Sequence, residues 1–163
     1  MRRFVLSKAG LVLVCLVAVV GCNDATEDVT LLQADLAGAN EVPPRGTAAQ
    51  GAAGFQVDGT TVHYSIEVHA ISAVTGAHIH SGAAGVNGPI RISLYPGPGV
   101  NFATTPSGSV DGVLIQGSFA ASQVVGITYD QLLSEMRAGT AYANVHTSQF
   151  PGGEVRGQVR EVQ

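Results

Sequence analysis

The chain has 163 residues, of which 45% are hydrophobic and 12% are charged, so it has room for one globular domain. It carries 8 basic and 12 acidic residues and no basic cluster outside its first residues, which argues against nucleic-acid binding. The only two cysteines are Cys15 and Cys22, so a disulfide-rich scaffold is excluded as well.

Residues 1–21 have the pattern of a lipoprotein signal peptide. Arg2, Arg3 and Lys8 precede an apolar run over 9–20, which is shorter than the roughly 20 apolar residues of a membrane span. The run ends in small residues before Cys22, as in a bacterial lipobox. We therefore expect Cys22 to be lipidated and to anchor the protein in the cell envelope, on the extracytoplasmic side of a bacterial membrane. The alternative is an ordinary signal peptide with an incidental cysteine.

Cleavage before Cys22 changes the charge of the chain. It removes three basic residues and no acidic one, which leaves 5 basic and 12 acidic residues and a net charge of −7. No nucleic-acid partner is expected for such a chain. Residues 22–28 are short, polar and acidic and are interpreted as a tether, so that residues 29–163 form the domain. With Cys15 removed, Cys22 has no intramolecular partner, and a core must hold the domain.

The first half of the domain predicts strands at 29–36, 55–57 and 62–70. A hairpin turn is expected at Asp58-Gly59, between the second and third of these. The third strand has the clearest alternation of apolar and polar residues, which predicts one buried and one exposed face. Its expected buried residues are Val62, Tyr64, Ile66, Val68 and Ala70.

The second half continues in the same way, with one exception. Strands are predicted around 78–80 and at 89–95, 112–119, 141–146 and 154–160, with a long loop over 96–111. One helix is expected at 129–138, because Thr128 and Gln131 form a capping box and Gly139 can end it. The pattern predicts an all-β fold, an antiparallel β-sandwich or barrel of about seven or more short strands, immunoglobulin-like or superoxide-dismutase-like, with one short inserted helix.

Three histidines are the candidate metal ligands. His78 and His80 are two residues apart on a strand, so their side chains point to one face. On a later strand, Tyr142, Asn144 and His146 are also two residues apart, so their side chains share a face as well. If the two strands are neighbours, the three imidazoles can meet and hold copper or zinc. Around the histidines we expect Tyr142, Asn144, Glu154 and Arg156. Glu154 is expected close enough to orient one of the rings, and Arg156 is expected at the rim of the site.

Other interpretations stay open. The three histidines can instead bond to carbonyl groups of the turns, and the glycine-rich loops can bind a protein, peptide or glycan partner. An enzyme ranks last, because Ser81 beside His80 is not by itself a nucleophile arrangement. His63 and His69 are expected on a solvated face with Glu67 rather than at a metal.

Three stretches carry a resemblance to a known family. They are LAGANEVPP at 36–44, HIHSGAAGVNGPI at 78–90 and YANVHTSQFPGGEVRGQV at 142–159. In this order and spacing they resemble the CHRD domain, first named in chordin and common in bacterial secreted proteins. The resemblance implies a β-sandwich-like fold and an extracytoplasmic setting, and it implies no particular reaction.

A fainter similarity is to the copper/zinc superoxide dismutases. It rests on the histidine pair, a later single histidine and an arginine near the C-terminus, which are His78, His80, His146 and Arg156 here. The disulfide cysteines and a zinc loop with further histidines are missing. The expected function is therefore a non-catalytic binding module, and the alternative is a copper/zinc redox protein of the dismutase-like type.

Overall fold

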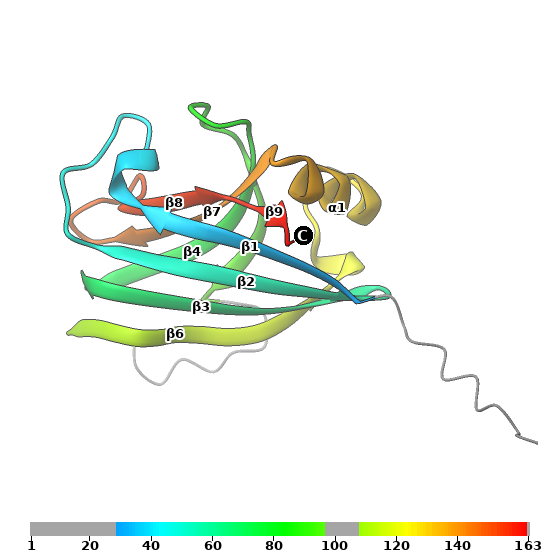
Figure 1. The fold of residues 1–163 in the computed structure, drawn as a ribbon, viewed down its shortest axis with the longest axis horizontal. Helices are drawn as coiled ribbons and strands as arrows, with labels where there is room; N and C mark the ends of the chain where they lie inside the picture. The colour runs from blue at the N-terminus through cyan, green and yellow to red at the C-terminus, as the bar shows by residue number, and fades with distance from the viewer. Residues whose placement is uncertain (1–28, 97–107, 163) are drawn as a thin grey trace, which may run out of the picture.

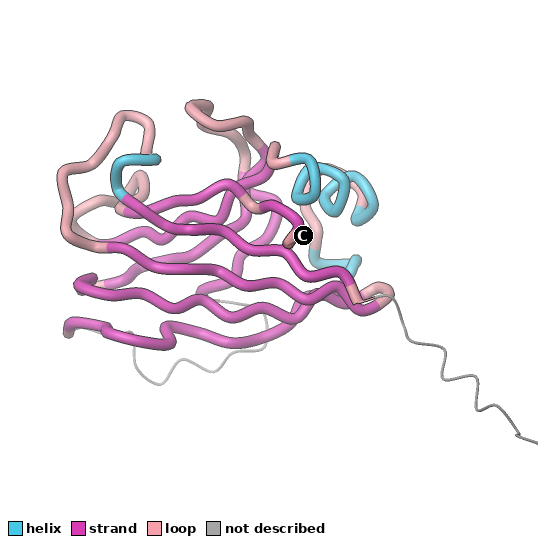
Figure 2. Tube along the Cα trace, in the orientation of Figure 1, coloured by secondary structure: helices cyan, strands magenta, loops and turns pink. Residues whose placement is uncertain are grey.

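The computed structural model describes residues 29–96 and 108–162 of the chain. The predicted signal peptide, Cys22, the tether and most of the predicted 96–111 loop lie outside these ranges. The described part is built from nine strands, two 3-10 turns and one α-helix (Figures 1 and 2). The strands are β1 (Thr30–Ala37), β2 (Gln50–Asp58), β3 (Thr61–Ser72), β4 (Val74–Ser81), β5 (Ile90–Tyr95), β6 (Ser109–Ala120), β7 (Ala141–Thr147), β8 (Val155–Gln158) and β9 (Arg160–Glu161).

All strands belong to one antiparallel sheet in the order β5-β4-β7-β8-β1-β2-β3-β6, and β9 pairs with β1. The sheet curls on itself, since the Tyr64 hydroxyl of β3 donates a buried hydrogen bond of 3.0 Å to the Leu94 carbonyl of β5. The result is a nearly closed barrel or sandwich with a single core. The predicted all-β antiparallel class with one short helix is confirmed.

The core is formed by the inward faces of the strands. On β3 the alternation predicts the burial correctly for Val62, Ile66 and Val68, which are fully buried. The prediction for Ala70 is wrong, because the ladder to β6 shifts register after Val68 and the chain passes through positive φ at Ala70. A β-bulge of this kind turns the next side chain away from the core.

The helix α1 (Tyr129–Ala138) begins and ends where the sequence predicts. The Thr128 hydroxyl accepts from the Gln131 amide, and Gly139 closes the helix with φ of 70°. Leu132, Leu133 and Met136 pack into the core. Among the described residues, no helix is both long and apolar enough to cross a membrane.

Several predicted strand boundaries are wrong, among them the start of β4, which begins at Val74 rather than near His78. β2 begins at Gln50, five residues before the predicted strand, because Ala and Gly at 51–54 give almost no alternation to read although their backbone pairs with β1 and β3. β6 begins at Ser109, inside the predicted loop. The predicted last strand is divided into β8 and β9 at Val159, whose amide bonds instead to the Ala141 carbonyl.

Candidate metal centre

The histidines lie on the outer face of β4 and β7. The register of these strands places Gly76 opposite His146, and His80 opposite Tyr142. The intervening residues, such as Ile79 and Val145, are fully buried in the core. The histidine side chains therefore have to point outward, toward the loops that cover this part of the sheet.

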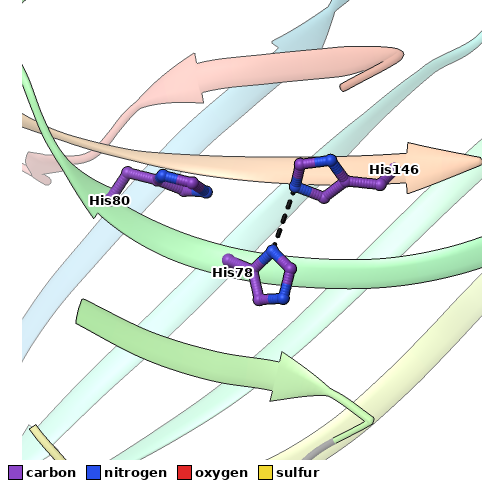
Figure 3. A group of neighbouring side chains, drawn as sticks. All are labelled: His78, His80 and His146. Carbon is purple, nitrogen blue, oxygen red and sulfur yellow. Dashed lines mark hydrogen bonds between the residues drawn. The ribbon is translucent and has the colours of Figure 1, made fainter. Parts of the chain in front are cut away.

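The three imidazoles converge, as the sequence predicts (Figure 3). One nitrogen from each of His78, His80 and His146 lies within 4.8 Å of the other two. The Nδ1 of His78 is 3.0 Å from the Nε2 of His146, and these two rings are 4.8 Å apart between centroids. Two metal–nitrogen bonds of about 2 Å span at most about 4 Å, so the three nitrogens are close to the spacing of ligands that share one ion.

Backbone carbonyl groups determine the tautomers of two rings. His80 Nδ1 is 2.9 Å from the Gly88 carbonyl, and His146 Nδ1 is 3.0 Å from the Pro151 carbonyl. A carbonyl can only accept, so both Nδ1 atoms carry the proton and both Nε2 atoms carry a lone pair. The Nε2 of His80 is buried and has no hydrogen-bond partner among the described residues. In this arrangement His78 Nδ1 donates to the Nε2 of His146.

All three histidines are held in the neutral state. Burial lowers the pKa of His78 to about 4, with further lowering by His146 and His80. The pKa of His80 is lowered mainly by burial, against the opposing bond to Gly88, and the pKa of His146 is lowered by burial. Neutral imidazoles are the form that binds a metal, so near pH 7 no proton has to be displaced from an imidazolium.

A stack of side chains fixes the ring of His80. Its imidazole lies parallel to the Tyr142 ring, with an interplanar angle of 9° and 4.8 Å between centroids. The Cζ of Arg156 lies 4.7 Å from the centre of the same tyrosine ring. Because β7 runs between β4 and β8, Tyr142 separates the arginine from the histidine. The Arg156 guanidinium therefore packs against the Tyr142 ring and not against the histidines that are the candidate metal ligands.

Gly88 bonds to both His80 and Tyr142, and we call this three-residue arrangement the clamp. Its carbonyl accepts from His80, and its amide donates to the Tyr142 hydroxyl at 3.2 Å. A Cβ at this position would lie 1.6 Å from the Ser81 carbonyl oxygen, so only glycine fits without moving the backbone. Gly76 has a related role, since a Cβ there would meet the His78 ring at 3.1 Å.

Two expectations about the surroundings are wrong. Arg156 is not at a rim but 2% exposed, and its guanidinium donates to the Asn40 carbonyl and the Asn87 side chain. Glu154 does not orient a ring, because its carboxylate accepts from the hydroxyls of Thr47 and Thr147. The rings are oriented by backbone carbonyls instead, which no sequence pattern reveals.

Glu41 is the residue that sequence reasoning missed. Its buried carboxylate accepts from the Asn144 amide at 2.6 Å and lies 3.8 Å from Arg156 Nε. Burial raises the pKa of this carboxyl, while Arg156 and Asn144 lower it. The signal available was its place as the only charged residue of the LAGANEVPP stretch. The Asn144 amide is therefore held by Glu41.

The remaining candidates lie elsewhere. His69 is partly exposed on β3, 2.5 Å from Asp111 and 3.3 Å from Glu67, and His63 is exposed. The Ser81 hydroxyl donates to Glu135 and accepts from Arg91, so it does not point its proton at a histidine base. None of these groups joins the histidine cluster, in agreement with the sequence analysis.

The fold and the site define the class of protein: a nearly closed antiparallel β-domain with a histidine cluster under its loops. The family model of the CHRD domain matches residues 32–159, most of the chain, and the chain belongs to this family. Searches of the curated proteins and of the solved structures gave no match. Membership of the family indicates a binding module.

Proposed function

We propose that this CHRD domain is an exported, membrane-anchored binding module that holds one copper or zinc ion through His78, His80 and His146. The observation that carries the proposal is the convergence of three neutral imidazoles, two of which have their Nδ1 atoms occupied by carbonyl groups. This is the arrangement that leaves lone pairs for a metal, and imidazole is a preferred ligand of both ions.

Small movements would bring the nitrogens into the geometry of a single ion. Ligands about 2.0 Å from a tetrahedral ion lie roughly 3.3 Å apart, whereas the present nitrogens lie within 4.8 Å of one another. His78 is the ring that has to adjust, since its Nδ1 now bonds to His146. It is only half-buried, and a metal would replace that bond with a stronger one.

The membrane anchor is a second part of the proposal and rests on the sequence of residues 1–22. A lipid on Cys22 would leave the domain on a tether of six residues at the membrane surface. A binding module in that position would take up its ion outside the cytoplasm, where the leader directs it.

The redox alternative has less support than binding. A dismutase-like site would use an arginine beside the metal, and Arg156 is the residue that the fainter similarity assigns to it. In the structure Arg156 packs on Tyr142 and is bonded to Asn40 and Asn87. A non-catalytic role therefore agrees with the observed contacts of Arg156 and does not require this side chain to move toward the metal.

Metal analysis of the purified chain tests the proposal. We expect one equivalent of copper or zinc after loading and dialysis, and loss of that ion in His80→Ala. His63→Ala, which changes an exposed histidine outside the cluster, is the matched control and should retain it. A wild-type protein that retains no ion, or a His80→Ala protein that retains it fully, would contradict the proposal.

A further inference from the structure

A second concave site lies beside the histidine cluster and is separate from it. It is a cavity of about 630 Å³ between the loop that follows β1 and the glycine-rich loop that follows β4. Val42 and Pro44 line it from the first loop, and Ala84 and Gly85 from the second. Its volume is within the range of about 300–1,000 Å³ that is typical of small-ligand sites.

The floor of the cavity carries opposite charges that do not neutralise each other. Asp35 of β1 and Arg160 of β9 both line it and are both exposed. β9 pairs with β1 so that Gln33 is opposite Arg160, which puts Asp35 two residues farther along the same face. Within the described ranges no ion pair joins Asp35 to Arg160. The two charges therefore face the cavity with a gap between them.

Farther in, Glu41 and Arg156 form a second pair of opposite charges, which lie 3.8 Å apart. The Glu41 carboxylate lines the cavity and is 4% exposed. Arg156 lies two residues before Gln158, which is itself a lining residue, on the same face of β8. Its Nη2 is buried and has no hydrogen-bond partner among the residues that the structure describes. Because Glu41 is already bonded to Asn144 and close to Arg156, Asp35 and Arg160 are the charged lining residues that remain for a ligand.

We propose that this cavity binds a small zwitterionic ligand, of the size of an amino acid or a short peptide. Its ammonium group would lie toward Asp35, and its carboxylate toward Arg160. Charge-assisted hydrogen bonds of this kind are the stronger ones, and each end of the ligand finds the opposite charge already in place. A residue-sized side chain would contact the small apolar groups of the walls.

A sugar fits the site less well. None of the described residues that line the cavity is aromatic, so these residues offer no ring face on which a sugar could stack. The amide of Gln158 already donates to the carbonyls of Gly82 and Gly139, and that of Asn40 donates to the Arg156 carbonyl. The charged donor left for a ligand is then the Arg160 guanidinium, which selects an anionic end.

The test is an NMR titration of the full chain, purified in detergent, with L-alanyl-L-alanine. We expect saturable shifts of the Ala39, Ala84 and Gly85 amides. N-acetylated and C-amidated forms of the same dipeptide, which each lack one charge, should bind at least about tenfold more weakly. Glucose is the probe for a neutral polyol.

Variants make the result specific. Arg160→Gln and Asp35→Asn change exposed residues, so both proteins should fold, which thermal unfolding checks. Each should weaken dipeptide binding about tenfold, whereas the matched controls Arg137→Gln and Glu67→Gln should bind as wild type does. Absence of saturable shifts, equal binding of the blocked dipeptides, preferential binding of glucose, or unchanged binding by Arg160→Gln would each overturn the inference. His80→Ala should still bind the dipeptide, so failure at the metal centre and failure here are distinguishable.

Discussion

Backbone carbonyl groups, not acidic side chains, orient the ligand candidates. Gly88 and Pro151 hold the Nδ1 protons of His80 and His146, which fixes the tautomers without adding negative charge. The nearby carboxylates of Glu41 and Glu154 are bonded elsewhere. An ion at the cluster would therefore meet neutral ligands only, and a divalent ion would keep its full charge. If the proposed ion is bound, an anionic fourth ligand from solvent would then be favoured.

The lowered histidine pKa values predict a pH dependence of stability. In the unfolded chain His78 has a pKa of about 6.5, and in the folded protein about 4. Below about pH 6.5, His78 therefore binds a proton in the unfolded state but not in the folded state. The free energy of unfolding then falls as the pH falls. This contribution is complete above the unfolded pKa and is lost progressively down to about pH 4.

Urea unfolding of the metal-free protein between about pH 7.5 and about pH 4.5 measures this effect. His78→Gln removes the titrating group, so its stability should decline less steeply with falling pH than that of wild type. Parallel curves for the two proteins would show that His78 titrates normally in the folded state.

Gly88 offers a test of the clamp. Gly88→Ala places a Cβ within 1.6 Å of the Ser81 carbonyl oxygen, so the backbone must shift. We expect a loss of about 3 kcal/mol or more in the free energy of unfolding, the upper range for overpacking, together with loss of the His80 bond. Gly46→Ala is the matched control, since a Cβ there meets nothing within 4 Å. Similar stabilities of the two variants in denaturant unfolding would contradict this description of the clamp.

At the level of the elements, the alternation of apolar and polar residues predicts the strands that have such a pattern. It misses strand segments that are held by backbone pairing alone. The strand with Val62, Ile66 and Val68 and the capped helix could be read from the sequence. The start of β2 could not, because Ala and Gly pair without an apolar pattern. The histidine pair predicts a common face, but the Arg156–Glu41 contact joins positions 115 residues apart. Such a contact depends on the order of strands, which local patterns do not contain.

The alternation on β3 gives a direct test of the core. Ile66 is fully buried, and Ser65 on the opposite face is only partly buried. Ile66→Ala should lower the free energy of unfolding by about 2–5 kcal/mol, because it empties a packed site. Ser65→Ala should change it by less than about 0.5 kcal/mol. Equal effects of both substitutions in chemical denaturation would mean that the face of β3 has been assigned wrongly.

At the scale of the molecule, the three stretches that resemble the family meet on one side of the sheet. The first contributes Asn40 and Glu41, the second the histidine pair and the glycine-rich loop, and the third His146 and Arg156. Asn87 of the glycine-rich loop donates to the Val42 carbonyl and accepts from Arg156, which ties all three together. The same loop borders the second cavity through Ala84 and Gly85. The two proposed binding sites therefore lie on the same side of the domain.

The proposed anchor concerns the chain as a whole. Cys22→Ser removes the thiol that would carry the lipid, so the protein should move to the soluble fraction or keep its leader. Stable attachment needs more than one acyl chain, which a mature lipoprotein provides. Fractionation of cells that express either form measures the outcome. If Cys22→Ser protein sediments with membranes as the wild type does, another feature must hold it there.

Ring-nitrogen NMR of nitrogen-15-labelled protein tests the claim that three neutral imidazoles share one ion. In the metal-free protein we expect protonated Nδ1 and unprotonated Nε2 atoms for His80 and His146. One equivalent of zinc should then shift the Nε2 signals of these two rings, leave their Nδ1 atoms protonated, and change His78. Signals of all three rings that stay unchanged while zinc is present would contradict the claim.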